Sequence, residues 1–298
     1  MDNYQQELYE KFSPFLLRRN EAPYPPAHKG EYLEEYFVRQ FRDDDKQYER
    51  YFIPIHWTAV FNYRVKEGLQ QGTPNWHLRQ ELFRAITELD TSKKYFTVST
   101  HDDAPQGNFG FDVTHFYAGG RSELSGTTPI PLLWSGYESV PDIQKMIFCS
   151  FVGSITHDIR PKVLIPLQEK PGYVIQAFEW VQDVPEDRQS IFQNVLWNSR
   201  FTLCPRGYGA NSYRIYEAMQ AGSIPVYVSD KFMLSWSDEI DWNEFCVIIP
   251  ENKVLETDAI LRSITETQVR KMQEKLKEVY PKYFTIPAAY NQITRRLT

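Results

Sequence analysis

The sequence lacks an excess of basic residues, and this absence removes a large class of partners. Its 298 residues include 33 Lys and Arg against 39 Asp and Glu, which gives a net charge of −6. Nucleic-acid-binding domains carry clustered Lys and Arg, and no basic block occurs here. We therefore expect no nucleic-acid partner. The negative charge also disfavours a strongly polyanionic ligand, because long-range repulsion opposes its approach.

Cysteine is scarce, and long apolar runs and targeting signals are missing. The three cysteines, Cys149, Cys204 and Cys246, match no metal motif, and their apolar surroundings predict buried free thiols. No stretch approaches the roughly 18 apolar residues of a membrane span, and the N-terminus has no signal-peptide pattern. We expect no membrane span and a cytoplasmic location, or the soluble catalytic domain of an anchored protein if an anchor has been removed.

What is present is an alternation of strand-like and helix-like segments. The length favours about two domains, and strands that alternate with amphipathic helices are typical of α/β folds with parallel sheets. We predict an N-terminal domain over 1–142 and a C-terminal domain over 143–298. The predicted strands are 51–55, 95–99, 130–134, 146–152, 173–178, 201–204, 223–229 and 245–249, and the predicted helices are 76–89, 186–198, 212–221, 265–280 and 288–297.

Prolines set the expected limits of two further segments. Pro23, Pro25 and Pro26 indicate that residues 1–48 are extended or looped, because proline and the residue before it disfavour a helix. Pro281 is expected to stop the long helix that precedes it.

The most informative segment runs from residue 201 to 228 and is typical of a strand, a glycine-bearing loop, a helix and a second strand. Gly207 and Gly209 are free to take a positive φ in the loop. Ser212 is placed to cap the start of the helix, and Gly222 is placed just after its end.

The charges of this segment indicate an anion site. A helix start offers free N–H groups and the positive end of the helix dipole, which favour an anion such as a diphosphate. Arg206 and Arg214 would add positive charge, and Glu217 on the same helix can accept hydrogen bonds from a ribose diol. These features suggest a nucleotide-sugar site. The alternative is an ordinary β–α–β unit with solvated arginines, because glycine loops recur in many α/β folds.

The stretch CPRGYGANSYRIYEAMQAGSIPVY closely resembles the signature of the exostosin-like glycosyltransferases, inverting sugar-nucleotide enzymes of GT-B architecture. Other stretches that resemble the family, among them 98–103, 151–160 and 240–245, occur in the family's order, so that the likeness covers about residues 50–285. The resemblance implies an α/β fold of GT-B type, with two Rossmann-like doubly wound domains facing a central cleft and a last helix, 288–297, that packs back on the first domain. The first would bind the acceptor and the second the sugar nucleotide, which the resemblance implies is a uridine diphosphate sugar.

The candidate donor site gathers residues that follow predicted strands, as ligand-binding residues do in open α/β sheets. His157 and Arg160 lie just beyond one such strand, and their alternative roles are helix capping and surface charge. The candidate donor-binding residues are Gly153, Ser154, His157, Arg160, Arg206, Gly207, Tyr208, Gly209, Asn211, Ser212, Arg214 and Glu217.

In the first domain, His101, Asp102 and Asp103 follow a predicted strand and resemble a His-Asp loop of the family. A carboxylate or imidazole there can act as general base toward an acceptor hydroxyl, whereas the alternative is that these side chains shape the loop by hydrogen bonding. The residues after Asp103 depart from the family's usual aromatic residue and glycine, which leaves the local geometry open. Further candidates for acceptor contacts are His56, Asp112 and His115.

These features predict an inverting glycosyltransferase that moves a sugar from a UDP-sugar to a hydroxyl of a glycan acceptor. Among the donors of the family, neutral xylose or galactose suit an acidic chain, with glucuronate and N-acetylglucosamine as further choices. The arginines and the helix start would replace a metal ion, so we expect neither metal nor cofactor. A catalytically weak glycan-binding or partner subunit of the same fold is the alternative, and a homo-oligomer is left open. A nicotinamide-dependent oxidoreductase is disfavoured, because no G-x-G-x-x-G follows a first strand.

Overall fold

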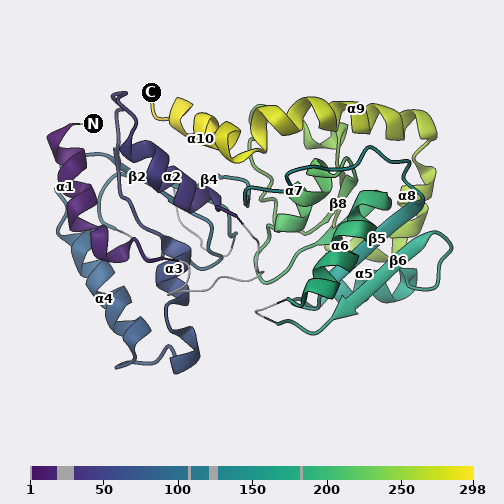
Figure 1. Cartoon of the computed structure of the whole chain (residues 1–298), viewed down its shortest axis with the longest axis horizontal. Helices are drawn as coiled ribbons and strands as arrows, with labels where there is room; N and C mark the ends of the chain where they lie inside the picture. Colours follow the sequence, from purple (N-terminus) through teal and green to yellow (C-terminus); the bar gives the residue numbers. More distant parts are fainter. Residues whose placement is uncertain (1, 19–29, 107–108, 121–126, 182–183) are drawn as a thin grey trace. The chain divides into compact units, whose positions relative to one another are not determined.

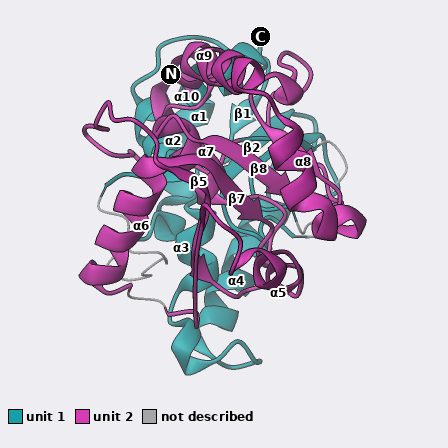
Figure 2. Ribbon diagram, turned by 90° about the vertical axis from the view of Figure 1, so that its right-hand side faces the viewer, with its two compact units in different colours: residues 1–130, 289–298 teal, residues 131–288 magenta. Residues whose placement is uncertain are grey.

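The computed structural model describes residues 2–18, 30–106, 109–120, 127–181 and 184–298. The chain forms two compact units, one of Met1–Ile130 with Ala289–Thr298 and the other of Pro131–Ala288 (Figure 2). The structure places residues 131–142 in the second unit, whereas the sequence analysis placed them in the first domain, and it places residues 289–298 in the first unit, where the last helix was expected to pack. Each unit has a parallel sheet of its own.

The first unit is built on parallel strands in the order β1-β2-β3-β4 (Figure 1). Every residue of β2 is buried, as expected of a strand in a parallel sheet that is covered on both faces. Because the strands are parallel, the loops that follow β1 and β2 leave the sheet at the same edge. The strands are β1 Tyr51–Phe52, β2 Tyr95–Ser99, β3 Val113–Tyr117 and β4 Thr127–Pro129.

Helices pack on both faces of this sheet. An apolar cluster joins α1, α3 and α4 to Ile53 and Tyr95. On the other face of the sheet, the ring centroid of Phe37 on α2 lies 5.1 Å from that of Phe52. The ring centroid of Tyr290 on α10 lies 5.0 Å from that of Phe37. The helices are α1 Asn3–Lys11, α2 Leu33–Arg42, α3 Trp57–Asn62, α4 Pro74–Thr87 and α10 Ile286–Arg295, with 3₁₀ turns η1 Ser13–Phe15 and η2 Val65–Glu67.

The two N-terminal helices correct the prediction that residues 1–48 are extended or looped. Asp2 caps α1 by accepting a hydrogen bond from the Gln5 N–H (2.8 Å). Phe37 and Phe41 stack 5.7 Å apart on α2, at the i, i+4 spacing that places side chains on one helix face. Outside the described residues lie Pro23, Pro25 and Pro26.

The second unit has parallel strands in the order β6-β5-β7-β8-β9 (Figure 1). The strand predicted over 173–178 and the helix predicted over 186–198 form with these limits. β5 is an inner strand, because it pairs with both β6 and β7. The strands are β5 Ile147–Ser154, β6 Tyr173–Phe178, β7 Ser199–Pro205, β8 Ile224–Val228 and β9 Val247–Ile249.

Two apolar clusters involve the helices of the second unit. One joins the strands to α5, α8 and the start of α9, and the other joins α6 to α7. The helices are α5 Ile159–Leu164, α6 Glu186–Asn198, α7 Tyr213–Gln220, α8 Thr257–Ser263 and α9 Glu266–Tyr283, with 3₁₀ turns η3 Ile165–Leu167, η4 Trp242–Glu244 and η5 Glu251–Glu256.

Two local predictions are wrong, both at prolines. The strand predicted over 130–134 does not form, since β4 ends at Pro129 and Pro131 has no N–H for a ladder hydrogen bond. Pro281 does not stop α9, which continues to Tyr283. Proline removes only one donor there, and the last turn is closed by the Phe284 N–H on the Tyr280 carbonyl (2.8 Å).

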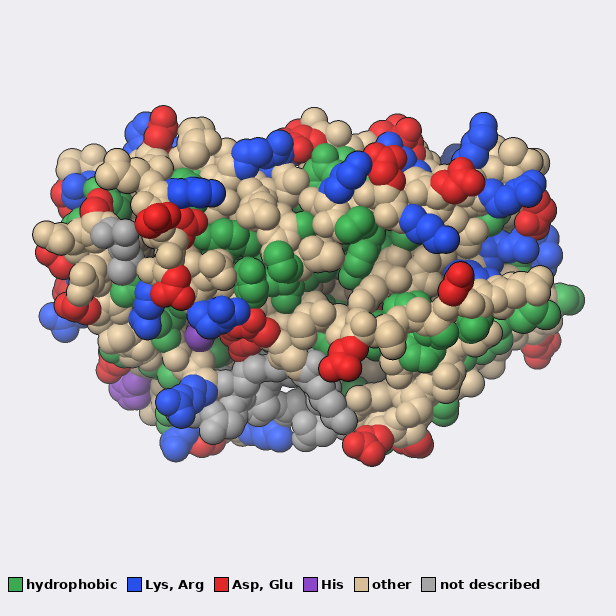
Figure 3. Space-filling view, turned by 45° about the horizontal axis from the view of Figure 1, so that its top comes forward, with side chains coloured by type: hydrophobic (Ala, Val, Ile, Leu, Met, Phe, Trp, Pro, Cys, Tyr) green, Lys and Arg blue, Asp and Glu red, His purple; other side chains and the backbone are tan. Residues whose placement is uncertain are grey.

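The α/β class predicted from the sequence is confirmed, with a parallel sheet in each unit. On the face shown in Figure 3, Lys and Arg side chains are interspersed with Asp and Glu side chains, and the described residues form no large field of one sign. In the described part of the chain, no helix combines the length and the apolar character that crossing a bilayer requires.

Candidate functional site

The signature segment forms the predicted unit of strand β7, loop, helix α7 and strand β8. Ser212 caps α7, because its Oγ accepts a hydrogen bond from the Arg214 N–H (3.4 Å). Asn211 Oδ1 accepts another from the Ser212 N–H (2.9 Å). Gly222 follows the helix with a φ of 66°, which confirms its predicted place. The two capping side chains occupy amides that the sequence analysis had assigned to an anion.

The glycines of the loop serve a purpose that the sequence did not reveal. Neither Gly207 nor Gly209 has the positive φ that was expected of them. At Gly207 the missing side chain leaves room for Arg160, since a Cβ there would lie 2.9 Å from Arg160 Nη2. Tyr208, between the two glycines, is 48% exposed and therefore accessible to a ligand.

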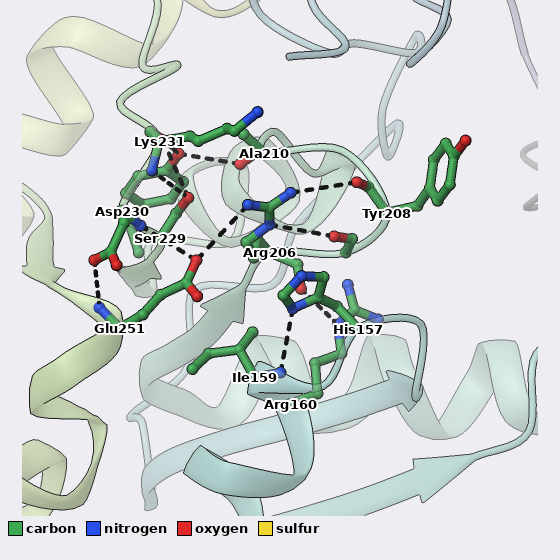
Figure 4. A network of polar contacts seen from close by, with 12 residues as sticks. His157, Ile159, Arg160, Arg206, Tyr208, Ala210, Ser229, Asp230, Lys231 and Glu251 are labelled. Carbon is green, nitrogen blue, oxygen red and sulfur yellow. Dashed lines mark hydrogen bonds and ion pairs between the residues drawn. The ribbon is translucent and has the colours of Figure 1, made fainter. Parts of the chain in front are cut away.

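Arg206 lies beyond the end of β7, and several oxygens hold it (Figure 4). Its N–H donates to the Val228 carbonyl (3.0 Å), and its Nη2 donates to the Tyr208 carbonyl (3.4 Å). Its Nη1 is 3.8 Å from Glu251 Oε1, and that oxygen also accepts a hydrogen bond from the Asp230 N–H (3.3 Å). Arg206 therefore lies at the carboxyl end of β7, where Glu251 neutralises part of its charge, and its role in diphosphate binding stays a prediction.

Arg160 and Arg214 bring two more guanidinium groups to the carboxyl end of β5. Arg160 donates from Nε to the Arg206 carbonyl (3.1 Å) and from Nη1 to the Ser154 carbonyl. Arg214 Nη2 donates to the Val152 carbonyl (2.8 Å). Burial lowers the pKa of both arginines, that of Arg160 to about 9, so Arg160 stays charged at neutral pH. Neither forms an ion pair with a carboxylate in the described part of the chain, and an anion would compensate their charge.

His157 caps α5 and also lies close to Arg160 and Arg206 (Figure 4). Its Nδ1 accepts a hydrogen bond from the Ile159 N–H (3.2 Å), which supports the capping alternative. Burial and the nearby Arg206 lower the pKa of His157, so the ring is neutral at neutral pH and carries its proton on Nε2. Ser154, nearby, donates from Oγ to the Glu179 carbonyl (3.4 Å).

Glu217 is buried on α7, where its Oε1 accepts a hydrogen bond from Trp134 Nε1 (3.2 Å). Burial raises the pKa of Glu217 to about 7, although Arg214 and Trp134 oppose this rise. Trp134 is thus a site residue that the sequence analysis missed, because nothing in the pattern links it to a residue 83 positions away. The role of Glu217 in ribose binding stays a prediction.

The loop after β2 in the first unit carries the three candidate bases. His101 Nδ1 accepts a hydrogen bond from the Asp103 N–H (3.1 Å), so the neutral ring has its proton on Nε2. Burial lowers the pKa of His101 to about 4. The Asp102 carbonyl accepts a hydrogen bond from the Tyr117 hydroxyl, and a Cβ on Gly119 would overlap the Asp102 Cα. These contacts favour loop shaping for His101 and fix the backbone of Asp102, whose role as base stays a prediction.

The further candidates of this unit have different surroundings. His56 Nδ1 donates to the Leu17 carbonyl (3.0 Å), and its buried Nε2 has no hydrogen-bond partner among the described residues. His56 also lines a cavity of about 640 Å³ whose wall includes side chains of both charges.

Asp112 forms an ion pair with Arg50 (2.6 Å) before the first residue of β3, at the opposite edge from the loops. His115 is buried within β3, and burial lowers its pKa to about 4. The structure therefore does not bring Asp112 or His115 to the edge of the sheet where the loops after β1 and β2 lie.

Glu34 is a buried carboxyl group that the sequence analysis did not find. It is 3% exposed, extends from α2 and accepts hydrogen bonds from the Thr58 N–H (3.0 and 3.3 Å). Thr58 Oγ1 is 3.0 Å from Thr100 Oγ1, so Glu34 is tied to the loops that follow both β1 and β2. Burial raises the pKa of Glu34 to about 8. No local pattern distinguishes it from its neighbour Glu35, because only tertiary packing buries it.

The cysteines are buried free thiols, as predicted. Within the described ranges, no group of three or more His, Cys, Asp and Glu side chains is arranged to hold a metal ion. Metal independence itself stays a prediction.

Residues 79–264, more than half of the chain, match the Exostosin GT47 domain. The chain therefore belongs to the exostosin GT47 family. An Exostosin-1 homolog of Caenorhabditis elegans is 34% identical over 92 residues, which are 31% of this chain and 24% of that protein. A probable glycosyltransferase of Arabidopsis thaliana is 29% identical over 203 residues, which are 68% of this chain and 34% of that protein. The chain thus spans about a quarter and about a third of the lengths of these two relatives.

Among solved structures, the chain is similar to TarM, with a TM-score of 0.43 and 11% identity over 71% of this chain and 52% of that chain. The C-terminal domain of a group 1 glycosyl transferase, LpcC of Francisella tularensis, gives a TM-score of 0.32 and 11% identity over 48% of this chain and 89% of that chain.

Proposed function

We propose that this protein is an inverting glycosyltransferase that transfers a sugar from a UDP-sugar to a hydroxyl group of a glycan. The observation that carries the proposal is the cluster of Arg160, Arg206 and Arg214 at the carboxyl ends of β5 and β7, in a chain of the exostosin GT47 family. Arg160 and Arg214 form no ion pair with a carboxylate among the described residues, and a diphosphate would add to the partial compensation that Glu217 gives Arg214.

The second unit would bind the donor. The arginines would hold the diphosphate and stabilise the charge that develops on it as the bond to the sugar breaks. His157 Nε2–H can add a neutral donor, and Tyr208 offers an exposed ring for a base or sugar. Glu217 would bind the ribose diol. We propose that the site needs no metal ion, because the arginines supply the positive charge.

The first unit would bind the acceptor and supply the base. The acceptor hydroxyl would attack the anomeric carbon, lose its proton to Asp102 and invert the configuration at that carbon, with Asp103 as the alternative base. His101 is less suited, because its Nδ1 is already an acceptor for the loop backbone. The cavity beside His56 suits a neutral glycan, since polar side chains of both signs can bind hydroxyl groups. Xylose and galactose are the donors that we favour, and a cytoplasmic location and a homo-oligomer stay predictions.

The test is calorimetric titration with UDP and a panel of UDP-sugars in the presence of a chelator, followed by transfer assays with the sugar that binds. Selective binding of UDP and one UDP-sugar supports the donor site and names the transferred group. Binding only after a divalent metal is added would contradict metal independence. A chain that binds a glycan but no nucleotide would favour the alternative, a catalytically weak partner or glycan-binding subunit.

A further inference from the structure

Two glycines of the donor region lie against guanidinium groups. Gly153 is a residue of β5, and a Cβ added to it would overlap Arg214 Nη2. A Cβ on Gly207 would lie 2.9 Å from Arg160 Nη2 and 3.0 Å from Thr156 Oγ1. Each glycine therefore leaves the space that one arginine head occupies.

Backbone conformation does not explain these glycines. Gly153 and Gly207 are not among the described glycines with positive φ, unlike Gly172 and Gly222 with φ of 87° and 66°. Gly153 pairs with Ala177 in the regular ladder of β5 and β6. Alanine is thus allowed at Gly153 by its backbone, and only the neighbouring side chain opposes it.

The two arginines converge on a single aromatic ring. The Cζ atoms of Arg214 and Arg160 lie 4.5 Å and 5.7 Å from the centroid of Phe151. Such contacts stabilise a cation at the ring face. Together with the hydrogen bonds to the main-chain carbonyls of Val152 and Ser154, they fix both heads beside the end of β5. The two positive charges repel each other. Each guanidinium group is nevertheless held by main-chain carbonyls and the Phe151 ring, with no carboxylate of the described residues in hydrogen-bond contact.

We propose that Gly153 and Gly207 are positioning residues of the donor site, which hold the guanidinium groups of Arg214 and Arg160 in place by leaving them room. The inference rests on the proposed function, in that the positioned groups would bind the diphosphate. It also assigns these glycines a role different from close approach of the backbone to the donor, because the arginine heads already occupy the space beside them.

The test is a double-mutant cycle of Gly153→Ala and Arg214→Lys, read by the affinity for UDP and by the melting temperature without ligand. Lysine lacks the forked guanidinium, so the overlap with a Cβ disappears. In the wild-type background, Gly153→Ala should weaken UDP binding about tenfold by displacing a charged hydrogen-bonding group, and should lower the melting temperature. In the Arg214→Lys background, the same substitution should change both quantities little, because contacting residues are not additive.

Gly172→Ala is the matched control in the same unit. Its strain comes from a positive φ and from Phe148 Cβ, which would lie 2.9 Å from the added Cβ, and no arginine is involved, so it should lower the melting temperature and leave UDP affinity unchanged. Equal effects of Gly153→Ala in both backgrounds, in affinity and in melting temperature, would overturn the proposal. If Gly153→Ala alone fails to fold, recovery of folding in the double variant supports the proposal and its absence overturns it. Wild-type protein that binds no UDP would refute the proposed function, whereas the coupling in melting temperature would still decide the role of the glycines.

Discussion

The carboxyl edges of the two sheets carry opposite kinds of buried group. In the second unit, the residues beyond β5 and β7 include Arg160 and Arg214, whose charges are held by carbonyls and an aromatic ring. In the first unit, the residues tied to the loops after β1 and β2 include the Glu34 carboxyl and the neutral His101 ring. Under the proposed function, the edge of the second unit would hold the anionic donor. The edge of the first unit carries groups whose pKa values favour the neutral form, and it would bind the uncharged acceptor hydroxyl.

This comparison predicts that variants of the two edges affect different quantities. Changes in the second unit should lower donor affinity, whereas changes in the first should lower turnover and leave donor affinity intact. Each substitution is therefore measured both by the quantity that it should alter and by the quantity that it should leave unchanged.

The largest effect is expected for Asp102→Asn. If Asp102 is the general base, the amide cannot take the acceptor proton, and kcat should fall about 1,000-fold. The affinity for UDP, measured by calorimetry, should stay at the wild-type value. Asp112→Asn is the matched control, because Asp112 lies before β3 in a surface ion pair with Arg50. Near-normal turnover of Asp102→Asn would transfer the role to Asp103 or another group.

The second largest effect is expected for Arg160→Met, which keeps the length of the side chain and removes its charge. Loss of one preorganised donor to the leaving diphosphate should lower kcat/KM about 100-fold. Donor affinity should fall as well, in contrast to Asp102→Asn. Arg200→Met is the control, since Arg200 pairs with Glu266 at the surface. Equal turnover of the two arginine variants would remove Arg160 from the donor site and weaken the contrast between the edges.

The sequence predicted the second edge better than the first, for a physical reason. The residues of the donor region are close in the chain, so that glycines, a helix cap and arginines are visible together within 201–228. The capping role of Ser212 and the position of Gly222 were predicted from local rules. Glu34 and Trp134 escaped notice, because their burial and partners arise from residues 24 and 83 positions away.

The distinction between local sequence pattern and tertiary packing also explains which fold predictions were correct and which were wrong. Strand 173–178 and helix 186–198 form as predicted, because their limits follow from local pattern. The prediction of an extended N-terminus was wrong, since α2 is stabilised by packing of Phe37 and Phe41 against strand residues that lie further along the chain. The space beside Gly153 is also a tertiary property, since it depends on a side chain 61 positions away.

A smaller effect is expected for Glu217→Ala. Loss of the ribose clamp should weaken UDP binding about tenfold, the worth of a hydrogen bond to a charged group. Inorganic pyrophosphate lacks a ribose, so its affinity should not change. Glu217→Gln keeps an acceptor for Trp134 Nε1, so it should lose less UDP affinity than Glu217→Ala. If pyrophosphate binding falls as much as UDP binding, Glu217 acts by orienting Arg214 and does not contact the ribose.

The smallest effect is expected for Glu34→Gln, and it concerns stability. In the unfolded chain the carboxyl ionises near its usual pKa of 4.5, whereas in the folded unit burial raises the pKa to about 8. Between these pH values the folded state binds more protons, so wild-type stability should fall as pH rises through this range. The uncharged amide does not titrate. Urea unfolding should therefore show Glu34→Gln gaining stability relative to wild type as the pH rises from 5 to 8, whereas the exposed Glu81→Gln should follow the wild-type trend. Parallel pH profiles for wild type and Glu34→Gln would mean that the carboxylate is charged in the folded unit, and the first edge would then hold a fixed negative charge opposite in sign to the arginines of the second.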